Sequence, residues 1–145
     1  MTPDQPVCRQ VAEAVRASLR GELLTAEISE GDGFSGRSVM SLLQRVARVY
    51  ESDSTACYVE VGVFRGLTLL SVAAAAPSLP CFGIDNFAQL DPDRKNLEVC
   101  LQRKARHSLE NVVLINRDYE DALGSLSEAL AGRTIGLYFV DGPHD

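Results

Sequence analysis

Near the middle of the chain the sequence reads Tyr58-Val59-Glu60-Val61-Gly62-Val63-Phe64-Arg65-Gly66. Its first part is largely apolar and β-prone, which is typical of a buried strand. Gly62 and Gly66 then bracket a turn that leads into an apolar helical pattern beginning at Leu67. Because glycine has no Cβ atom, backbone N–H groups in such a turn can approach a ligand closely. The pattern predicts a strand, a ligand-binding turn and a helix, although a tight turn without a ligand has the same spacing.

From residue 57 onward, short β-prone runs alternate with longer helical patterns. We predict strands over 57–61, 81–84, 112–115 and 135–140, and helices near 67–76, 94–108 and 120–131. Each predicted strand is apolar enough for a sheet that is covered on both faces, and right-handed crossovers make such a sheet parallel. The expected fold is therefore α/β, with a Rossmann-like parallel sheet flanked by helices.

The amino-terminal part of the chain has a different pattern. Apolar residues at helical spacing predict an amphipathic helix over about 5–20, packed on the outside of the domain. Residues 28–36 are rich in glycine and serine, which predicts a loop or linker. A second helix follows, with one apolar stripe made of Val39, Leu42, Leu43, Val46 and Val49. We therefore divide the chain into an amino-terminal helix and linker, residues 1–35, and an α/β domain, residues 36–145.

Composition and charge narrow the class of protein. A hydrophobic fraction of 46% beside 23% charged residues is typical of one globular domain, and no apolar run is long enough to span a bilayer. The net charge of -6 argues against a nucleic-acid backbone as the main partner. The first residues do not resemble a signal peptide, so we expect a cytoplasmic protein. The four cysteines contain no CxxC pair and are interpreted as reduced thiols, three of them buried.

Polar residues follow each predicted strand, at the edge where ligands of parallel sheets bind. In nucleotide-binding folds an aspartate placed like Asp85 accepts hydrogen bonds from both ribose hydroxyls, and Asp118 could similarly reach an adenine amino group. Either aspartate can instead cap a turn or a helix. Asp141 and His144 have the clearest chemical capacity, because they can share a metal ion or His144 can act as a base. Asp141-Gly142-Pro143 is also a common turn sequence.

Three segments resemble those of class I methyltransferases that depend on S-adenosyl-L-methionine (SAM). Glu60-Val61-Gly62-Val63-Phe64-Arg65-Gly66, followed by Thr68, is similar to the family's first motif, E-x-G-x-x-x-G. Gly83-Ile84-Asp85-Asn86-Phe87 and Tyr138-Phe139-Val140-Asp141-Gly142-Pro143-His144 resemble segments of the branch that includes macrocin-type sugar O-methyltransferases. The segments match in the right order, and the resemblance covers residues 36–145.

The resemblance implies that SAM is the cofactor and that residues 36–145 bind it. Gly62 and Gly66 would line the methionine part while Glu60 supports the loop, and Asp85 and Asp118 would contact the ribose and the adenine. The cofactor-binding residues expected in full are Glu60, Gly62, Val63, Phe64, Gly66, Thr68, Asp85, Asn86, Asp118, Tyr119 and Asp141. In metal-dependent members an aspartate after the fourth strand binds a divalent ion such as Mg²⁺. Asp141 is therefore the candidate metal ligand, and Asp141 and His144 are the candidate catalytic residues.

The family fold has seven strands, whereas the sequence predicts the first four of them. We expect a piece of a longer protein or a partner chain that supplies the rest, with an exposed sheet edge that favours association, including a homo-oligomer. The expected function is methylation of a small-molecule hydroxyl. A SAM-binding fragment or subunit without catalysis is a second hypothesis. A nicotinamide-dependent oxidoreductase is a third, and the glycine spacing argues against it because that class has G-x-G-x-x-G.

Overall fold

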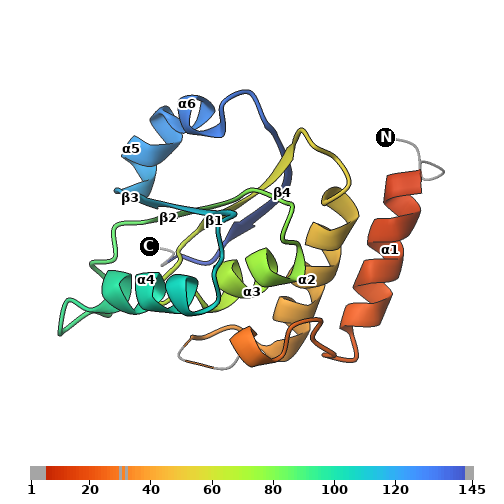
Figure 1. The fold of residues 1–145 in the computed structure, drawn as a ribbon, viewed down its shortest axis with the longest axis horizontal. Coiled ribbons are helices and arrows are strands. Elements are labelled where there is room, and N and C mark those ends of the chain that lie inside the picture. Colours follow the sequence, from red (N-terminus) through yellow and green to blue (C-terminus); the bar gives the residue numbers. More distant parts are fainter. Residues whose placement is uncertain (1–5, 30, 32, 143–145) are drawn as a thin grey trace.

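The computed structural model describes residues 6–29, 31 and 33–142. Its centre is a four-stranded parallel sheet with the strand order β3-β2-β1-β4 (Figure 1). The strands are β1 (Ala56–Val61), β2 (Cys81–Asp85), β3 (Val112–Asn116) and β4 (Thr134–Val140). All four begin and end within one residue of the predicted bounds, so the expected α/β fold with a Rossmann-like sheet is confirmed. The order reverses beside β1, which makes the β1–β4 junction the place where such sheets form a ligand crevice.

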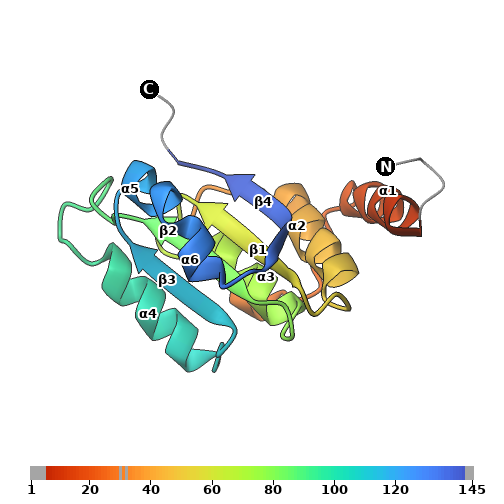
Figure 2. The same cartoon turned by 90° about the horizontal axis from the view of Figure 1, so that it is seen from above.

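Helices lie on both faces of the sheet, as Figure 2 shows from above. One face packs against α2 (Arg37–Tyr50), α3 (Leu67–Ala75) and α4 (Asn96–Arg106), and the other against α5 (Tyr119–Gly124) and α6 (Leu126–Leu130). The alternation of β1 side chains explains this division, because Ala56 and Tyr58 belong to the first core while Cys57 and Val59 belong to the second. The single helix predicted over 120–131 is wrong, since Ser125 separates two short helices.

The predicted amphipathic helix is α1 (Pro6–Ser18), which packs against α2 at the outside of the domain (Figure 1). A short 3-10 helix, η1 (Glu27–Ser29), then contacts α3. The buried face of α2 differs from the predicted stripe, because Val39 is exposed while Gln44 is fully buried. The Gln44 amide accepts from the Leu24 N–H at 2.7 Å and donates to the Ser29 hydroxyl at 3.1 Å. A buried amide with its partners satisfied holds residues 24–29 on the domain.

The two edges of the sheet are less covered than its centre. All six residues of β1 are buried, whereas Val113 of β3 and Ile135, Tyr138 and Val140 of β4 are exposed. The prediction that each strand is covered on both faces is therefore wrong for β4. The prediction of exposed apolar strand surface is confirmed there.

The cysteines are free thiols, and three of them, Cys57, Cys81 and Cys100, are buried as predicted. No helix in the described part of the chain is long and apolar enough to cross a membrane.

Candidate functional site

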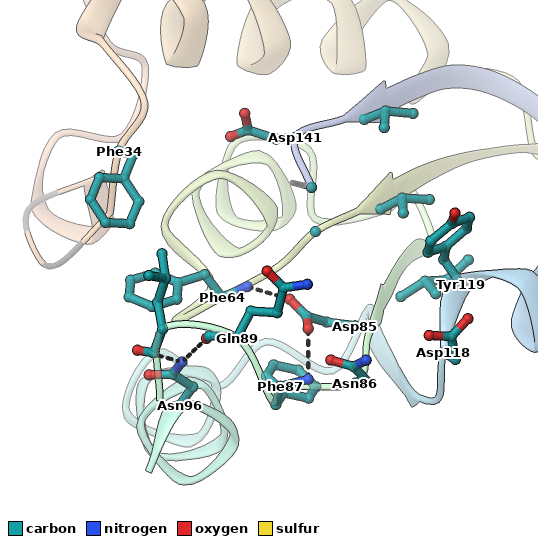
Figure 3. A pocket seen from close by; sticks show the side chains of 16 residues that line it. Phe34, Phe64, Asp85, Asn86, Phe87, Gln89, Asn96, Asp118, Tyr119 and Asp141 are labelled. Carbon is teal, nitrogen blue, oxygen red and sulfur yellow. Dashed lines mark hydrogen bonds between the residues drawn. The ribbon is translucent and has the colours of Figure 1, made fainter. Parts of the chain in front are cut away.

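A cavity of about 740 Å³ lies beyond the carboxyl ends of the strands (Figure 3). Its volume is in the range of small-molecule sites in enzymes. Residues that end or follow all four strands line it, as the strand-end pattern in the sequence predicts. Those that bear on its chemistry are Gly62, Asp85, Asn86, Asp118, Tyr119 and Asp141. Phe64 and Phe87 line it as well, and so does Phe34 of the amino-terminal segment.

The glycine loop, residues 62–66, contains both glycines in the left-handed region of backbone space, with φ of 90° for Gly62 and 79° for Gly66. A Cβ atom on Gly62 would lie 2.5 Å from the backbone nitrogen of Gly142, where the segments that follow β1 and β4 approach each other. A Cβ atom on Gly66 would lie 2.8 Å from Cys100 Sγ of α4. Gly62 lines the cavity, whereas Gly66 is buried against α4. Close packing thus requires glycine at both positions independently of any ligand.

Asp85 binds the glycine loop from the end of β2. Its Oδ2 atom accepts hydrogen bonds from the N–H groups of Val63 and Phe64, both at 2.7 Å, and its Oδ1 accepts from the Phe87 N–H at 2.6 Å. Asp85 also lines the cavity. A carboxylate oxygen has two lone pairs, so these bonds leave Oδ1 able to accept from one further donor. The expected contact of Asp85 with a ribose hydroxyl is compatible with this geometry and stays a prediction.

Glu60 lies behind the loop rather than in the cavity wall. It is fully buried in β1, and its carboxyl group accepts hydrogen bonds from the Tyr58 hydroxyl at 2.5 Å and the Thr68 hydroxyl at 2.6 Å. Burial raises the pKa of Glu60 to about 7, although the bonds from Thr68 and Tyr58 oppose the shift. Burial and the neighbouring Glu60 raise the pKa of the Tyr58 phenol well above its usual value, which keeps it a donor.

Four of the expected cofactor residues thus support the wall from behind. They are Glu60, Val63, Gly66 and Thr68, all buried. Glu60 and Thr68 join β1 to the first turn of α3, and the Val63 N–H binds Asp85.

The opposite end of the cavity is formed by Asn86, Asp118 and Tyr119 (Figure 3). Asp118 is the N-cap of α5, because its side chain accepts from the Glu120 N–H at 3.0 Å. Asp118 is also exposed and lines the cavity. It can therefore cap α5 and contact a ligand at the same time. The Asn86 side chain accepts from the Ala88 N–H, and half of the Tyr119 side chain is exposed. All three side chains are accessible to a ligand.

Asp141 follows β4 and is exposed at the cavity. Its N–H donates to the Val61 carbonyl at 2.8 Å, and its Oδ2 atom accepts from the Ser35 hydroxyl at 3.2 Å. His144, the other candidate catalytic residue, lies outside the described residues. Over residues 6–29, 31 and 33–142 no three His, Cys, Asp or Glu side chains come together as a metal site. The assignment of Asp141 as a metal ligand stays a prediction.

Sequence analysis missed several lining residues, among them Phe34, Gln89, Leu90 and Asn96. Asn96 is buried, its amide donates to the Gln89 carbonyl at 3.1 Å, and its Oδ1 accepts from Arg65 Nε at 2.9 Å. It thus ties the segment before α4 to the glycine loop. The preceding Asp91, which accepts from the Lys95 N–H at 2.7 Å, is a helix-start signal that could have drawn attention to Asn96. Phe34 had no such signal, because it lies in a glycine-rich loop.

The described lining of the cavity is acidic. It contains three carboxylates, from Asp85, Asp118 and Asp141, and no Lys, Arg or His side chain among the residues the structure describes there. A cleft lined by one sign of charge raises the local concentration of ligands of the opposite sign. The cavity therefore favours a cationic or neutral group over a phosphate.

A family model described as a methyltransferase domain matches residues 59–145. No curated protein matches the chain. The matched region begins within β1 and includes every lining residue named above except Phe34.

Proposed function

Because this chain belongs to the family of methyltransferase domains, we propose that it transfers the methyl group of SAM to a hydroxyl oxygen of a small molecule. Membership of the family implies SAM as the methyl donor. The hydroxyl acceptor rests on the resemblance of the segments around Asp85 and Asp141 to those of sugar O-methyltransferases. The macrocin-type branch remains part of the proposal.

The hydrogen bonds that the glycine-loop N–H groups already make favour SAM over a nicotinamide dinucleotide as the ligand. In dinucleotide-binding folds the loop amides face the pyrophosphate. Here the N–H groups of Val63 and Phe64 already donate to Asp85, and the nearest lining charges are carboxylates. A pyrophosphate would meet a negative group at that position. The sulfonium and ammonium groups of SAM are positive and would be attracted.

The cavity's two ends suggest how the cofactor would lie. We place the methionine part near Gly62 and Phe64, the ribose at Asp85, and the adenine between Asn86, Asp118 and Tyr119. Asp118 and Asn86 have oxygen atoms that can accept from an amino group, and the Tyr119 ring offers a flat apolar surface. These placements follow the resemblance position by position, and the lining of the cavity supports them.

When bound, SAM supplies an electrophilic methyl carbon, and transfer to oxygen leaves the electron pair of the broken carbon–sulfur bond on sulfur as S-adenosylhomocysteine (SAH). The protein's task is to position the acceptor hydroxyl and to take its proton. Asp141 is exposed at the methionine end, where the bond from Ser35 orients its carboxylate. We propose Asp141 as the group that orients the hydroxyl, with His144 as the base. No proton transfer is assigned to a metal ion, because the described residues do not form a metal site.

Isothermal titration of the chain with SAH, and separately with NAD, tests the proposal. We expect saturable binding of SAH alone. Asp85→Ala should weaken SAH binding by about 1–3 kcal/mol, because it removes a ligand contact and the anchor of the loop. Asp53→Ala is the matched control, since Asp53 also accepts a backbone N–H, from Thr55, in an exposed turn. Binding of NAD in place of SAH would contradict the proposal.

Catalysis is tested separately from binding. A SAM-binding module without activity would give the same titration. Incubation with methyl-labelled SAM and a panel of sugar, polyketide and amino-acid hydroxyls distinguishes the two, because only an enzyme forms SAH at a rate that depends on the acceptor.

A further inference from the structure

Phe34 is an exposed aromatic side chain at the wall of the cavity. Its exposed fraction is 80%, and its ring centroid lies 5.3 Å from that of Phe64, with the ring planes tilted by 39°. Of the lining residues it is the one that precedes the matched region. When a ligand covers an apolar ring that was exposed to water at a cavity wall, the free energy of the system falls. Phe34 is therefore placed to contact what fills the cavity.

Contacts on both sides hold residues 33–35 against the cavity. Gly33 packs on the first residue of α3 so closely that an added Cβ atom would lie 2.4 Å from Leu67 Cδ2. Two residues later, the Ser35 hydroxyl donates to Asp141 at the end of β4. The segment thus bridges the start of α3 and the end of β4, with Phe34 between the two contacts.

A guanidinium group connects Ile28, upstream of residues 33–35, to the glycine loop. Arg103 of α4 donates from Nη1 to the Arg65 carbonyl at 2.9 Å and from Nη2 to the Ile28 carbonyl at 3.0 Å. Arg103 thus links Ile28, which precedes residues 33–35 in the chain, to the glycine loop.

We propose that residues 33–35 form the wall of the cofactor cavity at its methyl-donor end, with the Phe34 ring facing the sulfonium group of SAM. The inference rests on the proposed function. Figure 3 shows Phe34 beside Phe64 and toward Asp141, at the end of the cavity opposite Asp118 and Tyr119. Aromatic faces attract cations. The Asp141 carboxylate adds a negative charge on the same side.

The chemistry of the two ligands provides a specific test. SAM and SAH differ by one methyl group and one positive charge, both at the sulfur atom. If the Phe34 ring faces that charge, replacing the ring by an aliphatic side chain reduces the affinity for SAM more than the affinity for SAH.

We would titrate the 145-residue chain, Phe34→Leu and a control with both ligands. In Phe34→Leu we expect the SAM dissociation constant to rise about fivefold and that of SAH to rise less than about twofold. Leu19→Ala is the control, because Leu19 is also exposed, at 75%, and does not line the cavity. It should leave both constants unchanged.

A fluorescence measurement gives an independent readout. The chain contains no tryptophan, so Phe34→Trp places a single reporter in the cavity wall. Saturation with SAM should shift its emission maximum to shorter wavelength, because the ligand displaces water from the ring. Leu19→Trp should show no shift.

The outcomes separate the inference from the proposed function. A wild-type chain that binds neither ligand would overturn both. Wild-type binding of SAM, combined with equal losses for SAM and SAH in Phe34→Leu, would overturn the inference alone. An unchanged emission of Phe34→Trp at saturating SAM would do the same.

Discussion

β1 and β4 are neighbouring parallel strands that both end at the cavity, yet they are built differently. Val61 and Val140 are paired in the sheet, but Val61 is 7% exposed and Val140 is 44% exposed. β1 carries the glycine loop and the buried Glu60, whereas β4 carries Asp141 and an exposed apolar surface. The part proposed to hold the cofactor is thus supported by the core. β4, which leads to the residues proposed to meet the acceptor, leaves Ile135, Tyr138 and Val140 exposed.

The largest expected effect on stability is at Gly62, where the chain after β1 approaches the chain after β4. Gly62→Ala should destabilise the fold by about 3 kcal/mol or more, because the new Cβ atom meets the Gly142 backbone and the φ of 90° is strained. Gly132→Ala is the control, since Gly132 has a φ of 82° with no atom within 4 Å of an added Cβ. Its cost should be about 1 kcal/mol. Equal losses of stability in urea unfolding would show that the close approach of Gly62 and Gly142 has no role in stability.

The second prediction concerns pH and Glu60. Its pKa in the folded chain is about 7, above the usual 4.5, so the folded state binds more protons between these values. The contribution of Glu60 to the free energy of unfolding should be largest below pH 4.5. This contribution should fall by roughly 3 kcal/mol as the pH rises through 7.

Glu60→Gln tests this pH dependence, because the amide does not titrate. The free energy of unfolding measured in urea at pH 5 and pH 8 should differ less in Glu60→Gln than in the wild-type chain. If both proteins lose the same stability over this interval, Glu60 is not the titrating group.

A third pair compares the strands directly. Val59→Ala in β1 removes two buried methyl groups and should cost about 2 kcal/mol. Val140→Ala in β4 should cost less than about 1 kcal/mol, because the side chain is already partly in water. Thermal unfolding of the two variants measures the difference. A loss in Val140→Ala as large as that in Val59→Ala would mean that another surface covers β4 in solution.

The smallest effect on stability is expected at Ser35. Its hydroxyl bonds Asp141 near the surface, so Ser35→Ala should change the free energy of unfolding by less than about 0.5 kcal/mol. Ser35→Thr keeps the hydroxyl and is the matched control. If Ser35 orients Asp141, Ser35→Ala should slow methyl transfer while leaving SAH affinity unchanged. Restored turnover in Ser35→Thr would separate the hydrogen bond from a loss of packing.

Local patterns in the sequence were sufficient to predict the strands and the position of the cavity. Apolar runs such as 57–61 end at glycine or polar residues, and parallel strands place those ends at one edge. Periodicity failed at α2, because a buried amide such as Gln44 counts as polar in any pattern. The helix over 120–131 failed because Ser125, which follows the weak helix former Gly124, leaves the helical conformation and divides it.

The residues that were missed depend on tertiary contacts. Asp85 was correctly placed at the cavity, but its three backbone donors come from the fold of the loop around it. Phe34 lies at the cavity between two tertiary contacts, the packing of Gly33 on Leu67 and the bond from Ser35 to Asp141. The spacing of residues in the sequence does not predict contacts between residues so far apart in the chain.

The double contact of Arg103 has a consequence for engineering this protein. Its guanidinium binds Ile28 in the amino-terminal segment and Arg65 in the glycine loop. Because both acceptors are backbone carbonyls, a chimera that takes residues 1–36 from a relative keeps this junction only if its backbone brings the carbonyl of residue 28 to the same place. When segments are exchanged to change the acceptor, the amino-terminal segment and α4 should therefore be transferred together.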